Sequence, residues 1–191
     1  LANVHAYKAV YALKELADST KPLVLASGNT EVKVPNSVLK AIAGNSPDSV
    51  TISVGISKST DINGAVSYVY EFTITFVKDG KTSTVSVFSE PIEVTVEVAD
   101  SIKDSRKVAA YYINESTGSL DYVGGKYRDG KLTFTINHFS KFVVIESNLT
   151  FGDITSHWAK DQIEVLASRK ITNGKTASTF DPGDNLTRAE F

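Results

Sequence analysis

The stretch "AVSYVYEFTITFV", residues 65–77, decides the fold class of this chain. Apolar and polar residues alternate along it, which is the period of a strand with one buried face. Similar alternation recurs in shorter segments on both sides: "VTISVGIS" (50–57), "TSTVSVFS" (82–89), "IEVTVEV" (92–98), "KVAAYYIN" (107–114), "LDYVGG" (120–125), "KLTFTI" (131–136) and "KFVVIE" (141–146). The connections include dipeptides suited to tight hairpins, namely Asn63-Gly64, Asp79-Gly80, Gly124-Gly125 and Asp129-Gly130. The pattern predicts a mainly β fold, an antiparallel sandwich or a partly open barrel.

One or two helices are expected to pack on these strands. Residues 3–19 have a 3.6-residue apolar period that stops at Lys21-Pro22, and "NSVLKAIAG" (36–44) predicts a short helix with Asn36 as N-cap and Gly44 after its end. Between them, residues 23–35 predict two short strands that turn at Gly28-Asn29. We expect residues 1–146 to form one β-rich domain with an N-terminal helix.

The pattern changes back to helical after a polar bridge at residues 147–150. In "SHWAKDQIEVLASRK" (156–170), Thr155 or Ser156 would cap a helix, Trp158 lies at its upstream edge, and an apolar stripe follows: Ala159, Ile163, Leu166 and Ala167. A turn-rich loop follows at residues 172–185. Thr187 and Glu190 then form a capping box, the start signal of another helix, which the sequence ends after barely one turn. Since there is also no Met, we expect the chain to be a piece of a longer protein.

Composition argues against several classes of function. The 20 basic and 22 acidic residues are well mixed, with a formal net charge of −2, whereas nucleic acids and anionic membranes select a clustered basic face. The absence of cysteine excludes thiol catalysis, disulfides and cysteine-ligated metals, and no apolar run approaches the ~20 residues that span a bilayer. The three histidines have no metal-binding spacing, and Asp181, Gly183 and Asp184 do not fit a calcium loop. We expect no cofactor, no metal and no enzyme activity.

Residues 150–191 closely resemble an S-layer homology repeat of bacterial surface proteins. The landmarks that match are Phe151, Asp153, His157-Trp158-Ala159, Ile163, Leu166, Ile171, Asn173-Gly174, Phe180, Pro182 and the final run Leu186–Phe191. The resemblance implies a small α-helical repeat, one of a set that usually comes in threes, here an incomplete first repeat. It also implies an extracellular, cell-wall location and non-covalent attachment of a larger secreted protein to secondary cell-wall polysaccharide, often pyruvylated.

The resemblance also implies roles for individual residues of this repeat. Thr187 and Glu190 would hold the helix start, and Arg188 would meet a carboxylate on the polysaccharide, because a guanidinium grips a carboxylate with two hydrogen bonds and helix N-termini attract anions. Trp158 would either pack the repeat or offer a face on which a sugar stacks. The simpler alternative for Arg188 is a solvated side chain. Residues 108–146 more loosely resemble β modules that precede such repeats in Gram-positive surface proteins, which implies a spacer or scaffold.

Two other functions remain open for the β-rich part. Tyr68 and Tyr70 share one strand face, and further tyrosines lie close by in sequence: Tyr111, Tyr112, Tyr122 and Tyr127. Aromatic rings arranged in this way would bind carbohydrate. The alternative is that they simply fill the core. Self-cleavage at His138-Phe139-Ser140 would have the Ser140 hydroxyl attack the Phe139 carbonyl, with His138 as base and a strained backbone. The alternative is a core Phe139 between two turn residues. Glu93 and Glu97 form either an acidic stripe or an ordinary solvated strand face.

Overall fold

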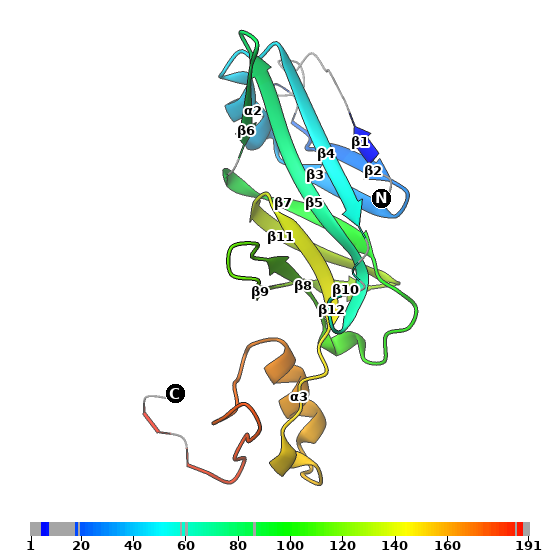
Figure 1. Ribbon diagram of the computed structural model, residues 1–191, viewed down its shortest axis with the longest axis vertical. Helices are drawn as coiled ribbons and strands as arrows, with labels where there is room; N and C mark the ends of the chain where they lie inside the picture. Colours follow the sequence, from blue (N-terminus) through cyan, green and yellow to red (C-terminus); the bar gives the residue numbers. More distant parts are fainter. Residues whose placement is uncertain are drawn as a thin grey trace.

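The computed structural model describes residues 5–7, 18, 20–57, 59, 61–85, 87–185 and 187–188. Within them, two antiparallel sheets are stacked, one helix lies at one end of the stack, and another lies beyond the opposite end (Figure 1). Sheet A has the order β1 (His5–Tyr7), β4 (Ser49–Ser57), β5 (Ala65–Lys78), β12 (Lys141–Glu146), β8 (Val108–Ile113) and β9 (Leu120–Gly124), with β6 (Lys81–Val85) also paired to β5. Sheet B has the order β10 (Lys126–Arg128), β11 (Lys131–His138), β7 (Val87–Glu97), β3 (Thr30–Val34) and β2 (Leu23–Ser27). The mainly β prediction is confirmed, in its sandwich form.

Strand β5 is the centre of sheet A. Its 14 residues pair with β4 along one edge and with β12 and then β6 along the other. Tyr70, Phe72 and Ile74 point into the core between the sheets, while Val69 faces a second, smaller apolar cluster on the outer side. A fully buried side chain of this size contributes about 1.5–3 kcal/mol, so the alternation seen in the sequence dominates the energetics of the fold.

The sequence prediction is wrong about where the strands begin and end in the segment after β6. Residues 82–89 and 92–98 were expected to be separate strands, but β6 stays in sheet A whereas β7 runs through Pro91 in sheet B. The register of β7 against β11 is irregular between its pairs Ile92–Ile136 and Val87–His138, and Pro91 lies in this irregular part. Proline is tolerated there because a bulge does not require its missing N–H.

Two of the four expected hairpin turns form as predicted. Asp79-Gly80 and Asp129-Gly130 both have positive φ at each position, which type I′ turns require. Gly124-Gly125 was wrongly predicted as a hairpin, because it carries the chain from β9 in sheet A to β10 in sheet B. Asn63-Gly64 ends a longer loop between β4 and β5 and is also not a two-residue hairpin.

The helical predictions for the first part of the chain were partly wrong. Helix α2 (Asn36–Ala43) buries Val38, Leu39 and Ile42, but its N-cap is Pro35, not Asn36, and Gly44 is a right-handed C-cap. The predicted helix at residues 3–19 is wrong over His5–Tyr7, which form β1 and pair with β4, whose free edge offers main-chain partners. Residues 8–17 and 19 lie outside the described residues.

The C-terminal part has a small core of its own. After the short 3-10 helix η2 (Gly152–Ile154), helix α3 (Lys160–Ser168) is shorter than the predicted 156–170, and a buried cluster joins the two: Phe151, Ile154, Ile163 and Ala167. Its N-cap is Ala159, so neither Thr155 nor Ser156 caps it; the Thr155 hydroxyl donates instead to the carbonyl of Gly152. Among the described helices, none has both the length and the apolar character needed to cross a membrane.

Candidate functional site

Asp153 organises the C-terminal loop around the small core. Its carboxylate accepts the N–H of Phe180 at 3.0 Å and that of Asp181 at 2.7 Å. These hydrogen bonds, first from Phe180 and then from Asp181, hold the pKa of Asp153 below its usual value. The Phe151 and Phe180 rings, with centroids 5.5 Å apart, pack behind this contact. Residues 27 positions apart are thus joined at the base of the loop.

Gly174 allows the same loop to close over the core. A Cβ at this position would lie 2.4 Å from Cε1 of Phe151 and 2.5 Å from the carbonyl oxygen of Thr179. No real side chain tolerates such contacts without displacing the backbone. The Thr176 hydroxyl accepts the N–H groups of Ser178 and Thr179, which finishes the turn. Several landmarks of the predicted repeat therefore have a direct structural role.

The residues expected to bind polysaccharide lie on the surface of this part. Trp158 is 86% exposed, so among the described residues it does not pack against the core of the repeat, and its role in a complete repeat stays a prediction. Its ring centroid lies 5.5 Å from that of His157, and His157 Nδ1 accepts the N–H of Ala159, which fixes the approach to α3. Arg188 and Thr187 are also exposed. Glu190 lies outside the described residues, so the predicted capping box stays a prediction.

An ion pair joins α3 to the sandwich. Lys107, at the end of the short 3-10 helix η1 (Ser105–Lys107), places its Nζ 2.6 Å from Oε2 of Glu164 on α3, and both side chains are largely buried. The second carboxylate oxygen accepts the hydroxyl of Thr150 at 2.7 Å. Burial raises the pKa of Glu164, but the hydrogen bonds from Lys107 and Thr150 outweigh it, so the pKa lies below the usual value. Glu164 is therefore charged and paired.

Further hydrogen bonds surround this pair, and together they form what we call the junction. Arg169 Nε donates to the carbonyl of Arg106 at 2.7 Å, and the Tyr111 hydroxyl donates to the carbonyl of Ser168 at 3.3 Å. The N–H of Ser147 donates to the carbonyl of Lys107 at 3.1 Å. Sequence reasoning missed the junction, although a glutamate between apolar positions 163 and 166 was a signal that one face of α3 is buried in polar surroundings.

The self-cleavage triplet lies in an ordinary strand connection. Phe139 packs edge-on against Phe88 with centroids 4.4 Å apart, and the His138 ring lies against Tyr112 at 4.9 Å. The carbonyl of Ser140 accepts the N–H of Phe72. None of residues 138–140 has a positive φ, so the left-handed strain that would favour cleavage is absent from these three residues.

The predicted row of tyrosines divides into core rings and one exposed ring. Tyr70 and Tyr111 are buried, and burial raises the pKa of both hydroxyls, in Tyr70 against a hydrogen bond with Thr30. Tyr112 and Tyr127 pack against the main core, and Tyr122 packs on the outer cluster of sheet A. Tyr68 differs, because it is 55% exposed.

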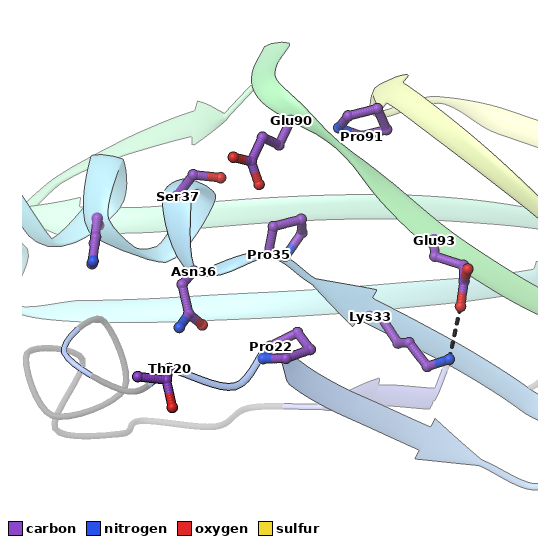
Figure 2. Close-up of a pocket in the computed structure, with 10 residues that line it drawn as sticks. Thr20, Pro22, Lys33, Pro35, Asn36, Ser37, Glu90, Pro91 and Glu93 are labelled. Atoms are coloured by element: carbon purple, nitrogen blue, oxygen red, sulfur yellow. Dashed lines mark hydrogen bonds and ion pairs between the residues drawn. The ribbon is translucent and has the colours of Figure 1, made fainter.

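A polar groove at the start of α2 combines prolines with charged side chains (Figure 2). Its Lys33 lies 2.7 Å from Glu93 and 3.4 Å from Glu31, so its charge is neutralised within the protein. The predicted acidic stripe is likewise engaged, since Glu97 accepts a hydrogen bond from Asn29. Within the described residues, no group of three or more His, Cys, Asp or Glu could hold a metal ion.

Comparison with known proteins agrees with the C-terminal geometry. Residues 150–191 match the model of the S-layer homology domain. An amylopullulanase of Thermoanaerobacterium thermosulfurigenes is 35% identical over 200 residues, which cover 96% of this chain and 10% of that protein. The exoglucanase XynX of Acetivibrio thermocellus is 52% identical over 48 residues, and the endo-1,4-beta-xylanase A of Thermoanaerobacterium saccharolyticum is 51% identical over 47, each covering 25% of this chain and 4% of the relative.

The chain thus spans a tenth or less of the length of the curated relatives it matches. The S-layer homology domain is an anchoring domain of cell-surface proteins, and such domains bind cell-wall polysaccharide. The match covers the whole segment built around Asp153, Gly174 and α3, with Trp158 and Arg188 on its surface. Residues 150–191 are matched by the S-layer homology domain model, and proteins with this domain lie at the bacterial cell surface, which places this chain there.

Proposed function

We propose that this chain attaches a larger secreted protein non-covalently to secondary cell-wall polysaccharide of the pyruvylated type. In this proposal residues 150–191 bind the wall and residues 1–146 form a separate β domain that acts as spacer. The observation that carries the proposal is the family match at residues 150–191 together with the exposed ring of Trp158 and the exposed guanidinium of Arg188. The relatives are named as polysaccharide-degrading enzymes, and this chain matches only a small part of each. A small matching part fits an attachment role.

The two exposed side chains suit an anionic sugar for different reasons. The Arg188 guanidinium can donate two parallel hydrogen bonds to the carboxylate of a pyruvate ketal, which is the stronger arrangement for an ion pair. The Trp158 indole offers a large planar apolar face, on which the C–H side of a sugar ring packs with little loss of conformational entropy. A neutral glucan would satisfy the ring but would leave the guanidinium without a partner.

The junction supports the spacer role of the β domain. A flexible linker would let the repeat rotate freely, whereas the Lys107–Glu164 pair and the Arg169–Arg106 hydrogen bond tie α3 to the sandwich. The wall-binding side chains are then held at a fixed distance from the sheets. A spacer of this kind sets both the reach and the orientation of what it carries.

Co-sedimentation with purified Gram-positive cell walls tests the proposal. The 191-residue chain and the same chain followed by two further repeats of the family are compared on native walls and on walls stripped of pyruvate ketals. We expect retention of the longer chain on native walls, a loss of about tenfold or more in affinity for Arg188→Ala and for Trp158→Ala, and weak retention on stripped walls.

The matched control is Arg128→Ala, which removes an exposed arginine from the β domain. It is expected to sediment like the unmodified chain. Equal retention on stripped and native walls would rule out the pyruvate ketal as the ligand. Unchanged retention of both Arg188→Ala and Trp158→Ala would remove these residues from the site.

A further inference from the structure

A groove of ≈ 530 Å³ opens between the first half of β5 and the residues that end and follow β7. Tyr68 and Tyr70 line the β5 side, and Glu97 and Asp100 line the other side. The N–H of Ala99 donates to the carbonyl of Val66 at 2.7 Å, so main-chain bonding fixes one wall against the other. We call this feature the Tyr68 groove. It contains none of the residues of the wall-binding segment.

The position of Tyr68 is unusual for its strand. It lies two and four residues from Tyr70 and Phe72, so it shares the core-facing side of β5, where those rings are only 3% and 1% exposed. Tyr68 is nevertheless 55% exposed, because the groove opens beside it. The neighbouring Ser67 hydroxyl donates to the carbonyl of Tyr68 at 2.7 Å and accepts the N–H of Val144 at 2.9 Å. The ring is therefore exposed on a rigid, doubly tied piece of strand.

The opposite wall supplies acceptors and negative charge. Asn29 Nδ2 donates to Glu97 at 2.8 Å, which orients that carboxylate and leaves its second oxygen for other donors, and Asp100 is exposed. Among the described residues that line the groove, none is Lys, Arg or His. The carboxylates of Glu97 and Asp100 would repel an anionic ligand, which disfavours the carboxylate-bearing wall polymer.

We propose that the Tyr68 groove binds a neutral oligosaccharide, with one sugar ring against Tyr68 and hydroxyl groups donating to Glu97 and Asp100. A sugar ring presents an apolar face of C–H groups and a rim of hydroxyl donors, and this groove pairs an aromatic face with carboxylate acceptors at its rim. A purely apolar peptide side chain would leave both carboxylates unused. The inference concerns the β-rich part alone and does not depend on how residues 150–191 bind the wall.

Isothermal titration of the 191-residue chain with maltohexaose, cellohexaose and xylohexaose tests this site, with oligogalacturonate as the anionic comparison. We expect saturable binding of at least one neutral hexamer and none of oligogalacturonate. Tyr68→Ala is expected to weaken that binding about tenfold or more, whereas Tyr68→Phe, which keeps the ring, changes it less than about threefold. Glu97→Gln is expected to weaken it several-fold by removing an ionic acceptor.

Val87→Ala is the matched control, because it removes an exposed apolar side chain of the sandwich that does not line the groove. It is expected to bind the neutral hexamer like the unmodified protein, and circular dichroism establishes that each variant is folded. Absence of binding by all three neutral hexamers overturns the inference. So does equal binding by folded Tyr68→Ala, equal loss in Val87→Ala, or tighter binding of oligogalacturonate.

Discussion

At the scale of single residues, the C-terminal loop depends on Asp153 and Gly174 for opposite reasons. Asp153 supplies a charged acceptor to two main-chain N–H groups that would otherwise be left to solvent. Gly174 has no side chain, which leaves room where Phe151 and two carbonyl groups converge. Both are among the positions on which the resemblance to an S-layer homology repeat rests, and the structure gives each a physical reason. Each leads to a separate prediction.

Because Asp153 is charged and bonded to the loop, we expect the stability of the loop alone to depend on the protonation of this carboxylate. Because its pKa in the folded protein is lowered, its contribution to stability is present above the ordinary value of 3.8 and is lost as the pH falls through the folded value. The amide proton shifts of Phe180 and Asp181, followed by NMR, are expected to titrate together with a midpoint below 3.8. In Asp153→Asn this titration is expected to disappear. A midpoint at or above 3.8 in the unmodified protein would contradict the assignment.

A methyl group at Gly174 is expected to destabilise the C-terminal part. Gly174→Ala forces a Cβ against Phe151 and the Thr179 carbonyl, and overpacking of this kind costs about 1–3 kcal/mol. Urea unfolding followed by hydrogen exchange of the α3 amides measures the effect. Gly183→Ala is the matched control from the same loop, since nothing lies within 4 Å of its Cβ position. Equal midpoints for the two variants would show that the loop yields without strain.

At the scale of elements, helix α3 has two buried faces of different character. Ile163 and Ala167 face the small core of the C-terminal part, whereas Glu164 and Ser168 are buried beside them and contact the sandwich. Both pairs are four residues apart, so each forms its own row along the helix. The apolar row is visible in the sequence as a stripe. The polar row is visible only when its partners Lys107 and Tyr111 are placed in space.

Removing only one partner of the Lys107–Glu164 pair is expected to destabilise the protein strongly. Lys107→Met removes the nearer cation of a buried carboxylate, leaving only Lys160 at 3.9 Å, and is expected to lower the free energy of unfolding by about 3 kcal/mol, measured by urea denaturation at pH 7. The double variant Lys107→Met/Glu164→Leu is expected to recover most of this loss, because no uncompensated charge remains. Lys141→Met is the control, since its pair with Glu115 is more exposed and contributes about 1 kcal/mol or less. Equal losses for the two single lysine variants would show that burial does not strengthen the junction.

The same pair gives the junction a defined dependence on pH. The folded pKa of Glu164 is lowered, so its contribution is fully present above the ordinary value of 4.5 and is lost as the pH falls through the folded value. The difference in stability between the unmodified protein and Lys107→Met is therefore expected to shrink below pH 4.5. Denaturation midpoints at pH 7 and pH 3.5 measure this. A difference that does not change between these two pH values would assign the loss to packing of the lysine stem.

The secondary-structure elements also show how much of the fold can be predicted from the sequence. Alternation in residues 65–77 identifies β5 and its buried face, because period 2 reports which side of a strand meets the core. Alternation does not report which sheet a strand joins, so the crossing at Gly124-Gly125 and the passage of β7 through Pro91 were predicted incorrectly. In the candidate site, local motifs point to Trp158 and Arg188, and their binding role stays a prediction. The exposure of Tyr68 was not predictable, because it depends on which strands end beside it.

At the scale of the whole molecule, the junction decides how the two parts move. Three contacts connect them directly, Lys107–Glu164, Arg169–Arg106 and Tyr111–Ser168, and a fourth, Ser147–Lys107, ties the bridge between them to η1. Two of these use the main-chain carbonyls of Arg106 and Lys107 in η1. The residues just before η1 are bonded to Glu146 at the end of β12 through the N–H groups of Lys103 and Asp104. The chain between the parts is therefore bonded on both sides and does not behave as a free tether.

This arrangement predicts that the sandwich and α3 tumble as one body in solution. Residual dipolar couplings of amides in β5, β8 and β12 and of those in α3 are expected to fit a single alignment tensor. In Lys107→Ala/Arg169→Ala, which removes both charged contacts of the junction, the two sets are expected to require tensors of different magnitude. The control Lys103→Ala/Arg128→Ala removes two exposed cations of the sandwich and is expected to keep one tensor. Two tensors in the unmodified protein would make residues 147–150 a flexible hinge, and the β domain would then set the distance from the wall but not the orientation of what it carries.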